Sequence, residues 1–450
     1  MTYAEFIRRK SQLGGDHGFE PDFLPDYLFD FQAHLVEWAV RKGRAAIFAD
    51  CGMGKTPMQL VWAENIVRHE NKPVLIMAPL SVSQQTVEEA EKFQIDAKRS
   101  MTGKSEGARV VVTNYERLHY FNPDEFAGVV CDESSIIKNF DGSRKGEITE
   151  FMKKVKYRLL CTATAAPNDY IELGTSSEAL GYLGYMDMLT TFFKNDEDSL
   201  HPASMGSKWR FKSHAQRDFW RWMASWARAC RKPSDLGFDD RDFVLPQLSE
   251  TEVVANSLIP FGEMFHTPAQ TLEDQREDTR ATIEARSELA ANILATGRPG
   301  IAWCHLNSEA DLLERIIPGA VQVSGSDDDD RKEEVFNAFR HGQVRVLVTK
   351  PKIAAFGMNW QHCDHMTYFA THSFEQYYQA VRRCWRFGQL NPVKVEVVTS
   401  SSQAGVLANL KRKADACDVM FSQLVSEMNN AISLDRLKIF NKTEELPSWL

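Results

Sequence analysis

The 450-residue chain lacks the features that would assign it to several special classes of protein. It has no run of about 18 apolar residues, so no membrane-spanning helix is predicted. Residues 1–10 contain no signal-peptide core, and the eight cysteines form no C-x-x-C pair. We therefore expect reduced thiols and a cytoplasmic location. The net charge of -9 excludes a chain that is basic throughout, so any nucleic-acid contact must be local.

Short apolar runs recur in two sets, and most of them are apolar on both faces, as buried parallel strands are. Helix-like segments such as 57–68 and 311–317 lie between them. This alternation predicts an α/β fold with two doubly wound parallel-sheet lobes. The alternating pattern of 393–397 predicts an edge strand. The runs are 45–49, 74–78, 109–113, 128–131 and 157–162 in the first set, and 300–304, 321–323, 344–349, 366–370 and 393–399 in the second.

A phosphate-binding loop follows the first apolar run. Gly52 and Gly54, on either side of Met53, let the backbone approach phosphates and direct its N–H groups toward them. The helix that follows adds its positive end. We expect Lys55 to reach the β- and γ-phosphates and Thr56 to bind Mg²⁺.

An acidic pair follows a strand-like run in the same half of the chain. Asp132 is expected to hold Mg²⁺, and Glu133 to orient or deprotonate an attacking water. In the other half, Arg383 and Arg386 stand one helical turn apart in a segment that begins with Gln379. A guanidinium from a second lobe could stabilise charge on the γ-phosphoryl group only when the lobes close, which is typical of a motor.

Together these motifs resemble the superfamily 2 helicase-type motors, in the Swi/Snf-like branch of double-stranded DNA translocases and in the short form found in bacteria and their viruses. The second motif of that branch, acid-acid-x-x-x-aliphatic-Lys-Asn, matches residues 132–139. The resemblance covers roughly residues 28–400. Further matches in family order are Phe31-Gln32 and the segments 78–82, 113–116, 162–168, 323–331, 349–359 and 379–389.

The resemblance implies two RecA-like lobes that hydrolyse ATP with Mg²⁺ and track along double-stranded DNA. It implies catalytic roles for Lys55, Asp132, Glu133, Arg383 and Arg386. It implies nucleotide contacts from Gln32, which would pair with the adenine edge, and from Gly357, Asn359 and Gln379. It implies contacts to DNA from Ser81 and Thr113 in lobe 1, and from Ser324, Thr349 and Lys350 in lobe 2.

The domain boundaries that we expect are 1–179 for lobe 1, 180–246 for a helical insertion, 247–400 for lobe 2 and 401–450 for a helical tail packed on lobe 2. Within the insertion, residues 208–232 contain eight basic residues and one acidic residue, a balance of 8 − 1 = +7, with six interleaved aromatic residues. Two interpretations have equal weight. One is a nucleic-acid contact that includes Lys208, Arg210 and Lys212, and the other is a helix that packs its tryptophans while its arginines face water.

Three departures from the family pattern leave alternatives to a duplex-tracking motor open. Ser135 replaces a usual His or Gln, while Ala163 and Ala355 replace glycines. The first alternative is a helicase that separates DNA or RNA strands, for which no wedge element is evident. The second is a slow nucleotide-gated clamp that recruits a nuclease, methylase or repair partner, although Glu133 and the two arginines argue against it.

Two segments with metal-ligand residue types receive other interpretations. The acidic run 327–330 predicts the first turn of a helix capped by Ser326 rather than a metal site. The segment 361–365 is too short to surround one zinc ion with four ligands.

Overall fold

The computed structural model describes residues 15–105, 107–138, 142–163, 165, 170–195, 209–212, 215–255, 279–354, 358–371, 373–400, 403 and 406–440. The chain divides into two compact units. Unit 1 comprises Met1–Pro79, Ser83–Arg241 and Asp418–Leu450, and unit 2 comprises Leu80–Val82 and Asp242–Cys417.

Unit 1 contains a seven-stranded sheet, sheet A, in which the strands pair in parallel, in the order β3-β4-β2-β5-β6-β1-β9. Five of these strands correspond to the predicted apolar runs, and nearly all of their residues are buried. A strand covered on both faces needs apolar side chains at successive positions, which explains why the runs do not alternate. The strands are β1 (Arg44–Ala49), β2 (Val74–Ala78), β3 (Ala97–Arg99), β4 (Val110–Asn114), β5 (Gly128–Asp132), β6 (Tyr157–Thr162) and β9 (Ala227–Cys230).

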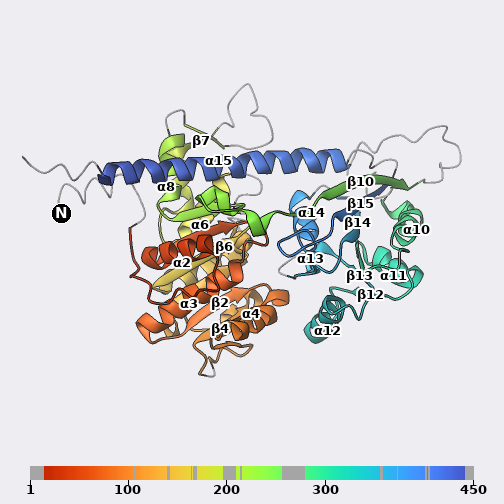
Figure 1. Ribbon diagram of the computed structural model, residues 1–450, viewed down its shortest axis with the longest axis horizontal. Coiled ribbons are helices and arrows are strands. Elements are labelled where there is room, and N and C mark those ends of the chain that lie inside the picture. Colours follow the sequence, from red (N-terminus) through yellow and green to blue (C-terminus); the bar gives the residue numbers. More distant parts are fainter. Residues whose placement is uncertain are drawn as a thin grey trace, which may run out of the picture. The chain divides into compact units, whose positions relative to one another are not determined.

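Helices connect these strands, as parallel pairing requires. The first two, α2 and α3, lie side by side (Figure 1). The N-terminal segment is fastened to them, because the side-chain amide of Asn65 on α3 accepts bonds from the backbone N–H groups of Asp22 and Phe23. The helices are α2 (Asp30–Lys42), α3 (Lys55–Glu70), α4 (Leu80–Lys92), α5 (Ser143–Lys154), α6 (Leu173–Leu180), α7 (Tyr185–Phe192) and α8 (Gln216–Ala224).

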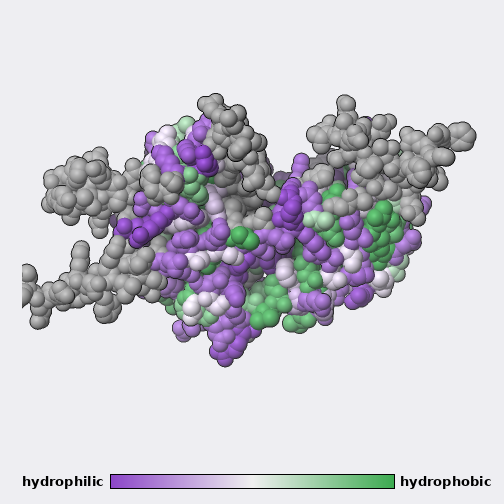
Figure 2. Space-filling view, turned by 90° about the horizontal axis from the view of Figure 1, so that it is seen from above, coloured by the Kyte–Doolittle hydropathy of each residue, from purple (hydrophilic) through white to green (hydrophobic). Residues whose placement is uncertain are grey.

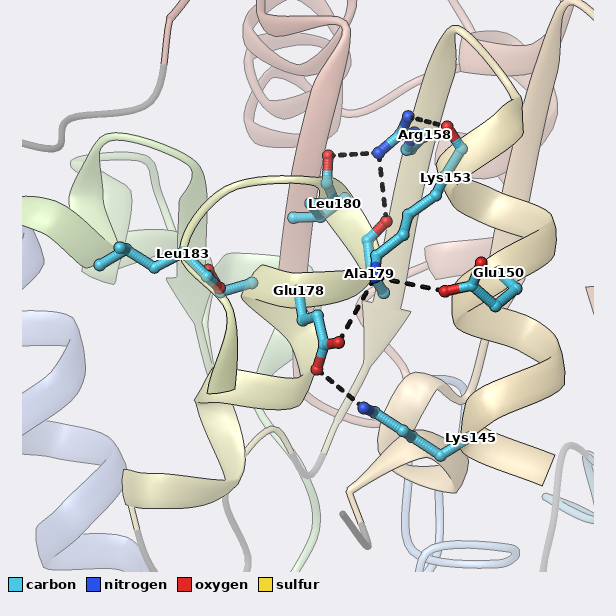
Figure 3. Close-up of polar contacts among 9 residues, drawn as sticks. Lys145, Glu150, Lys153, Arg158, Glu178, Ala179, Leu180 and Leu183 are labelled. Atoms are coloured by element: carbon cyan, nitrogen blue, oxygen red, sulfur yellow. Dashed lines mark hydrogen bonds and ion pairs between the residues drawn. The ribbon is translucent and has the colours of Figure 1, made fainter. Parts of the chain in front are cut away.

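A buried arginine on β6 fixes the ends of two of these helices (Figure 3). Arg158 is 4% exposed and donates to the carbonyls of Lys153, Val155 and Leu180 at 2.6, 2.8 and 2.9 Å. These carbonyls lie at the ends of α5 and α6 or directly after them, where the last C=O groups of a helix have no partner within the helix. Glu178 of α6 also pairs with Lys153 at 3.4 Å. Arg158 therefore holds both helix ends against the sheet.

The segment predicted as a helical insertion, 180–246, contributes directly to the core of unit 1. Its strand β9 pairs with β1 in sheet A, and Trp220, Trp222 and Trp226 are at most 1% exposed. Six interleaved aromatics bury too much apolar area to stay outside a core. The structure therefore places much of this segment inside lobe 1 rather than beside it. A short antiparallel hairpin, β7 (Phe193–Asn195) and β8 (Trp209–Phe211), completes the segment.

Unit 2 contains a six-stranded sheet, sheet C, again with parallel pairing, in the order β10-β15-β14-β11-β13-β12. All five predicted runs of the second set are strands in it. Helices α10 and α11 lie side by side in this unit (Figure 1). The elements are β10 (Leu248–Ala255), α10 (Ile283–Ile293), β11 (Gly300–Trp303), α11 (Asn307–Ile316), β12 (Ala320–Val323), α12 (Asp329–Arg340), β13 (Val346–Thr349), α13 (Pro351–Ala354), β14 (His365–Phe369), α14 (Phe374–Val381) and β15 (Val393–Ser400). These two sheets confirm the predicted α/β fold with two RecA-like lobes.

Two local predictions in unit 2 are wrong. β15 is not an edge strand, because it pairs with both β10 and β14. Of the two charged residues that make its sequence alternate, Lys394 is exposed, but Glu396 is 3% exposed and pairs with buried His365 at 3.0 Å. The N-cap of α12 is Asp328, which accepts a bond from the Arg331 N–H at 2.7 Å, so Ser326 is not the cap.

The long helix α15 (Val406–Phe440) belongs partly to each unit. Its start packs in the core of unit 2 through Val406, Leu407 and Leu410. Leu424 and Met428 instead belong to the core of unit 1. Among the described residues, no helix is long and apolar enough to cross a membrane. Hydrophilic residues predominate on the described surface that Figure 2 draws, with separate hydrophobic patches between them.

Candidate nucleotide and nucleic-acid sites

The predicted phosphate loop connects the carboxyl end of β1 to the first turn of α3. Gly52 and Gly54 have φ values of +88° and +76°, which L side chains rarely adopt. A Cβ on Gly54 would also lie 2.2 Å from Nε2 of Gln32. No acidic residue occupies the first turn of α3, so its positive end is not neutralised locally. This geometry suits a phosphate group.

Lys55 folds back over the loop from the start of α3. Its Nζ donates to the carbonyls of Ala49 and Asp50 at 3.0 and 3.3 Å. The Asp50 carboxylate accepts a bond of 2.6 Å from the N–H of Cys51, which shapes the first part of the loop. Lys55 and Thr56 both stay partly exposed, so both remain accessible to a ligand.

Gln32 lies beside this loop, but its amide is engaged by the chain itself. Its Oε1 accepts from the N–H of Phe29 at 3.1 Å, and its Nε2 donates to the carbonyl of Met53 at 2.9 Å. The side chain is only 4% exposed. Gln32 therefore ties the start of α2 to the loop, and pairing with an adenine edge would require it to exchange these bonds.

The acidic pair lies at the carboxyl end of β5, two strands from β1 in the sheet. Gln59 of α3 donates a bond of 2.6 Å to Oδ1 of Asp132. Thr162, at the end of β6, donates from Oγ1 to Oε2 of Glu133 at 3.4 Å. Glu133 has a φ of +50°, a left-handed conformation that costs about 1–2 kcal/mol for an L residue. Such strain often marks a functional position.

Burial determines the electrostatics of Asp132. Desolvation, reinforced by the neighbouring Glu133, raises the pKa of Asp132 to about 6, while Gln59 and Lys55 act in the opposite direction. A divalent cation would favour the ionised carboxylate. The oxygen donors of Asp132 and Thr56 are of the kind that Mg²⁺ takes, and Mg²⁺ commonly needs only one or two carboxylates besides phosphates and water. The residues therefore fit a Mg²⁺ ion bound with a nucleotide.

The two predicted arginines of unit 2 have different surroundings. Arg383 is 2% exposed and donates to the carbonyls of Gln379 and Met358 at 3.0 and 3.1 Å. Arg386 is half-buried, and its guanidinium is 3.5 Å from the Met358 carbonyl. Only Arg386 keeps part of its surface accessible. Arg383 holds together the segment from which Arg386 projects.

The remaining predicted nucleotide contacts of unit 2 lie nearby in the sequence. Gln379 is 4% exposed on α14, where its carbonyl accepts the bond from Arg383. Asn359 is half-buried, and its Oδ1 has no hydrogen-bond partner within the part of the chain that the structure describes. Gly357 lies outside the described residues.

The residues predicted to contact DNA differ in how far their side chains are buried. Thr113 and Thr349 are both 0% exposed, and the Thr349 hydroxyl donates to the Val323 carbonyl. These threonine side chains therefore do not present themselves to a ligand. They lie at the last or next-to-last residue of strands β4 and β13, where the sheet buries both faces. Ser324 and Lys350 are half-buried at the carboxyl edge of sheet C, and Nζ of Lys350 donates to Asn307.

Two further predicted DNA contacts cannot be placed. The side chain of Ser81 and all of Lys208 lie outside the described residues.

The aromatic residues of the basic stretch pack in the core, as one of its two interpretations expected. Lys212 caps the end of α7 by donating to the carbonyls of Thr190 and Thr191 at 2.5 and 3.3 Å. The guanidinium of Arg228 lies 4.2 Å from the ring centre of Trp38. Arg210 is exposed. Lys212 and Arg228 therefore make contacts that support the fold, a role that the net charge of the stretch did not indicate.

Sequence reasoning missed two residues that contact the acidic pair. Gln59 lies one helical turn after Thr56, so helical spacing would have placed both on one face of α3. Tyr115 follows β4, and its hydroxyl donates to the main-chain carbonyl of Asp132. No sequence pattern signals that contact, because it joins two strands that are not neighbours in the sheet.

Comparison with known proteins places this geometry in a family context. Residues 286–388 match the helicase conserved C-terminal domain. The mouse "DNA annealing helicase and endonuclease ZRANB3" is 30% identical over 181 residues, which cover 35% of this chain and 17% of the mouse protein. These two matches confirm a resemblance to helicase-type proteins. The part that matches this chain is about one sixth of the length of the mouse protein.

Two further relatives belong to other organisms. Protein p41 of Acyrthosiphon pisum secondary endosymbiont phage 1 is 29% identical over 168 residues, which cover 32% of this chain and 36% of p41. The Sulfolobus solfataricus SWI2/SNF2 ATPase core in complex with double-stranded DNA aligns with 91% of this chain and 96% of that chain, at 18% identity and a TM-score of 0.43.

Proposed function

We propose that this protein is an ATP-hydrolysing motor that tracks along double-stranded DNA. The observation that supports it most is the arrangement at the carboxyl edge of sheet A. There the loop that contains Lys55 and the pair Asp132–Glu133 belong to one unit and are joined by the bond from Gln59 to Asp132. An accessible lysine, a carboxylate suited to Mg²⁺ and a second carboxylate oriented by Thr162 are the parts that phosphoryl transfer to water requires.

Each of these side chains has a separate task in the proposed reaction. Lys55 would leave its carbonyl partners and bind the β- and γ-phosphates. Thr56 and Asp132 would hold Mg²⁺, which when bound neutralises charge on the phosphates. Glu133 would orient the attacking water and accept its proton. Arg386 would stabilise the negative charge that develops on the γ-phosphoryl group, with Arg383 as its support.

Contacts to the DNA backbone would convert turnover into movement. Segments after the strands of each sheet, including Ser81, Ser324 and Lys350, would bind phosphates with little regard to sequence. The name of the mouse relative, a DNA annealing helicase and endonuclease, supports DNA as the partner. Affinity should therefore fall steeply as salt concentration rises, and an affinity that is insensitive to salt would argue against this mode of binding.

A reducing compartment suits the cysteines of the proposed motor. The seven cysteines whose side chains the structure describes are free thiols, and of these all but Cys51 are buried. We infer a cytoplasmic location from this chemistry.

Steady-state ATPase assays test the proposed function most directly. Turnover would be measured without nucleic acid and with single-stranded DNA, double-stranded DNA or RNA, and the Lys55→Ala variant would serve as the control. Strong stimulation by duplex DNA is the expected result. Stimulation mainly by single strands or RNA would favour a strand-separating helicase instead, and slow turnover in every condition would favour a nucleotide-gated clamp.

A further inference from the structure

Tyr115 connects two parts of unit 1 that have different roles in the proposed function. It directly follows β4 and begins a short 3-10 helix, Tyr115–Tyr120, whose residues Glu116, His119 and Tyr120 are exposed. Tyr115 itself is 3% exposed. Its hydroxyl donates to the main-chain carbonyl of Asp132 at the end of β5. Since β2 lies between β4 and β5 in the sheet, this bond spans the carboxyl end of an intervening strand.

The hydrogen bonds around Tyr115 have a fixed direction. The Asp132 carbonyl can only accept, and it therefore takes the single phenolic proton. The Cys131 Sγ lies 3.2 Å from the phenolic oxygen and donates to it in turn. The chain of bonds runs from Cys131 through Tyr115 to Asp132.

The carbonyl at the end of this chain belongs to the peptide group that precedes Glu133. Its orientation is coupled to the left-handed φ of +50° at Glu133. That φ in turn sets the direction in which the Glu133 side chain leaves the backbone, and its carboxylate accepts a bond from the hydroxyl of Thr162. A change in the position of Tyr115 would therefore be transmitted to the side chain expected to orient the attacking water.

We propose that Tyr115 is a positioning residue that couples the segment after β4, which would lie against DNA, to the orientation of Glu133. This inference rests on the proposed function, because it assigns ATP hydrolysis to Asp132–Glu133 and DNA contact to the exposed face of Tyr115–Tyr120. Movement of that segment on DNA would act on Glu133 through the bond from the Tyr115 hydroxyl to the Asp132 carbonyl.

The Tyr115→Phe variant tests the inference because it removes one oxygen atom and keeps the buried ring. Tyr182→Phe is a matched control: the Tyr182 hydroxyl also donates to a main-chain carbonyl of the sheet, that of Arg44 at 2.7 Å, but at the opposite end of β1. Each full-length variant would be assayed for kcat and KM for ATP with and without duplex DNA. Hydrogen exchange of the peptide that spans residues 131–137 gives a readout independent of turnover.

For Tyr115→Phe we expect the stimulation of kcat by DNA to fall about tenfold, the change that loss of one buried hydrogen bond can produce. The KM for ATP and the Kd for DNA should stay within about twofold, and exchange in 131–137 should quicken. Tyr182→Phe should leave all four quantities unchanged. These results would support the inference.

Three results would separate its failure from that of the proposed function. Retention of full DNA stimulation in Tyr115→Phe would overturn the inference alone. An equal loss of kcat with and without DNA, or the same loss of stimulation in Tyr182→Phe, would overturn the coupling role. Absence of stimulation by any nucleic acid in the wild-type chain would overturn the proposed function itself.

Discussion

The side-chain amide of Gln59 donates a hydrogen bond of 2.6 Å to Oδ1 of Asp132, and the two side chains are only 1% and 6% exposed. The bond joins the helix that begins at the phosphate loop to the strand that ends in the acidic pair. It orients the carboxylate that is proposed to hold a metal ion. Partners of this kind orient metal ligands and tune their basicity.

Gln59→Leu should weaken the response to Mg²⁺, because the Asp132 carboxylate would lose the donor that orients it. We expect the Mg²⁺ concentration for half-maximal ATPase activity to rise about tenfold. The free energy of unfolding should fall by about 1–3 kcal/mol, measured by urea titration. Gln85→Leu is the control, since the side-chain amide of Gln85 pairs with Glu89 along α4. An unchanged Mg²⁺ requirement in Gln59→Leu would show that this amide does not position Asp132.

Glu133→Gln should keep ATP binding and lose hydrolysis by about 100-fold or more, because an amide cannot accept the proton of the attacking water. Binding of a fluorescent ATP analogue and steady-state turnover measure the two effects separately. Glu125→Gln makes the same chemical change at an exposed position and should have no effect. Normal turnover in Glu133→Gln would remove this residue from its proposed role.

Arg383→Ala and Arg386→Ala should differ, although the two arginines belong to one sequence motif. Removal of the buried Arg383 takes away its bonds to the carbonyls of Gln379 and Met358 and creates a cavity, so we expect a loss of about 3 kcal/mol in unfolding free energy. Arg386→Ala should unfold like the wild type but lose DNA-stimulated ATPase activity. Urea unfolding and turnover, measured on both variants, check this. Equal stability of the two variants would contradict the assignment.

Gly181→Ala should destabilise unit 1 through its contact with Arg158. Gly181 has a φ of +84°, and an added Cβ would lie 2.4 Å from the Arg158 guanidinium. We expect a loss of more than about 1 kcal/mol in the free energy of unfolding.

Two glycines in open space serve as controls. Gly237→Ala, at a φ of +86°, isolates the backbone strain and should cost less. Gly146→Ala, within α5 and also in open space, should stabilise by about 1 kcal/mol. Thermal or urea unfolding measures the stability of all three variants. A smaller loss of stability in Gly181→Ala than in Gly237→Ala would contradict the expected clash with Arg158.

His305 should make stability depend on pH. Burial lowers its pKa to about 4, despite the nearby Glu309, and its Nε2 lies 2.9 Å from the Phe369 carbonyl, which requires the neutral ring to donate. The unfolded chain binds a proton near pH 6.5 and the folded chain only near pH 4, so stability falls as pH decreases through this window. Between pH 7 and pH 5 the loss from this group is about 2 kcal/mol.

The matching measurement compares urea unfolding at the two pH values for the wild type and His305→Gln. Glutamine can keep the bond to Phe369 but does not titrate, so its difference in stability between pH 7 and pH 5 should be smaller by about 2 kcal/mol. The same difference in both proteins would show that His305 does not titrate on unfolding in this range.

The sequence alone determined the two-lobed α/β architecture and the order of the motifs. Buried parallel strands need apolar residues on both faces. Consecutive apolar residues, as in 74–78 and 157–162, can therefore be recognised from each segment of the sequence alone. The phosphate loop is equally local, since its glycines, lysine and threonine are contiguous. The acidic pair could be located because it directly follows a strand.

Only the tertiary structure decided which of these side chains are accessible and what fixes them. Burial depends on what packs from distant parts of the chain, so the sequence did not reveal that Thr113, Thr349 and Arg383 are enclosed. Nor did it reveal that the basic, aromatic stretch supplies the edge strand β9, because the pairing of β9 with β1 joins residues about 180 positions apart. The bonds from Gln59 and Tyr115 to Asp132 likewise depend on the folding of separate segments onto one edge of a sheet.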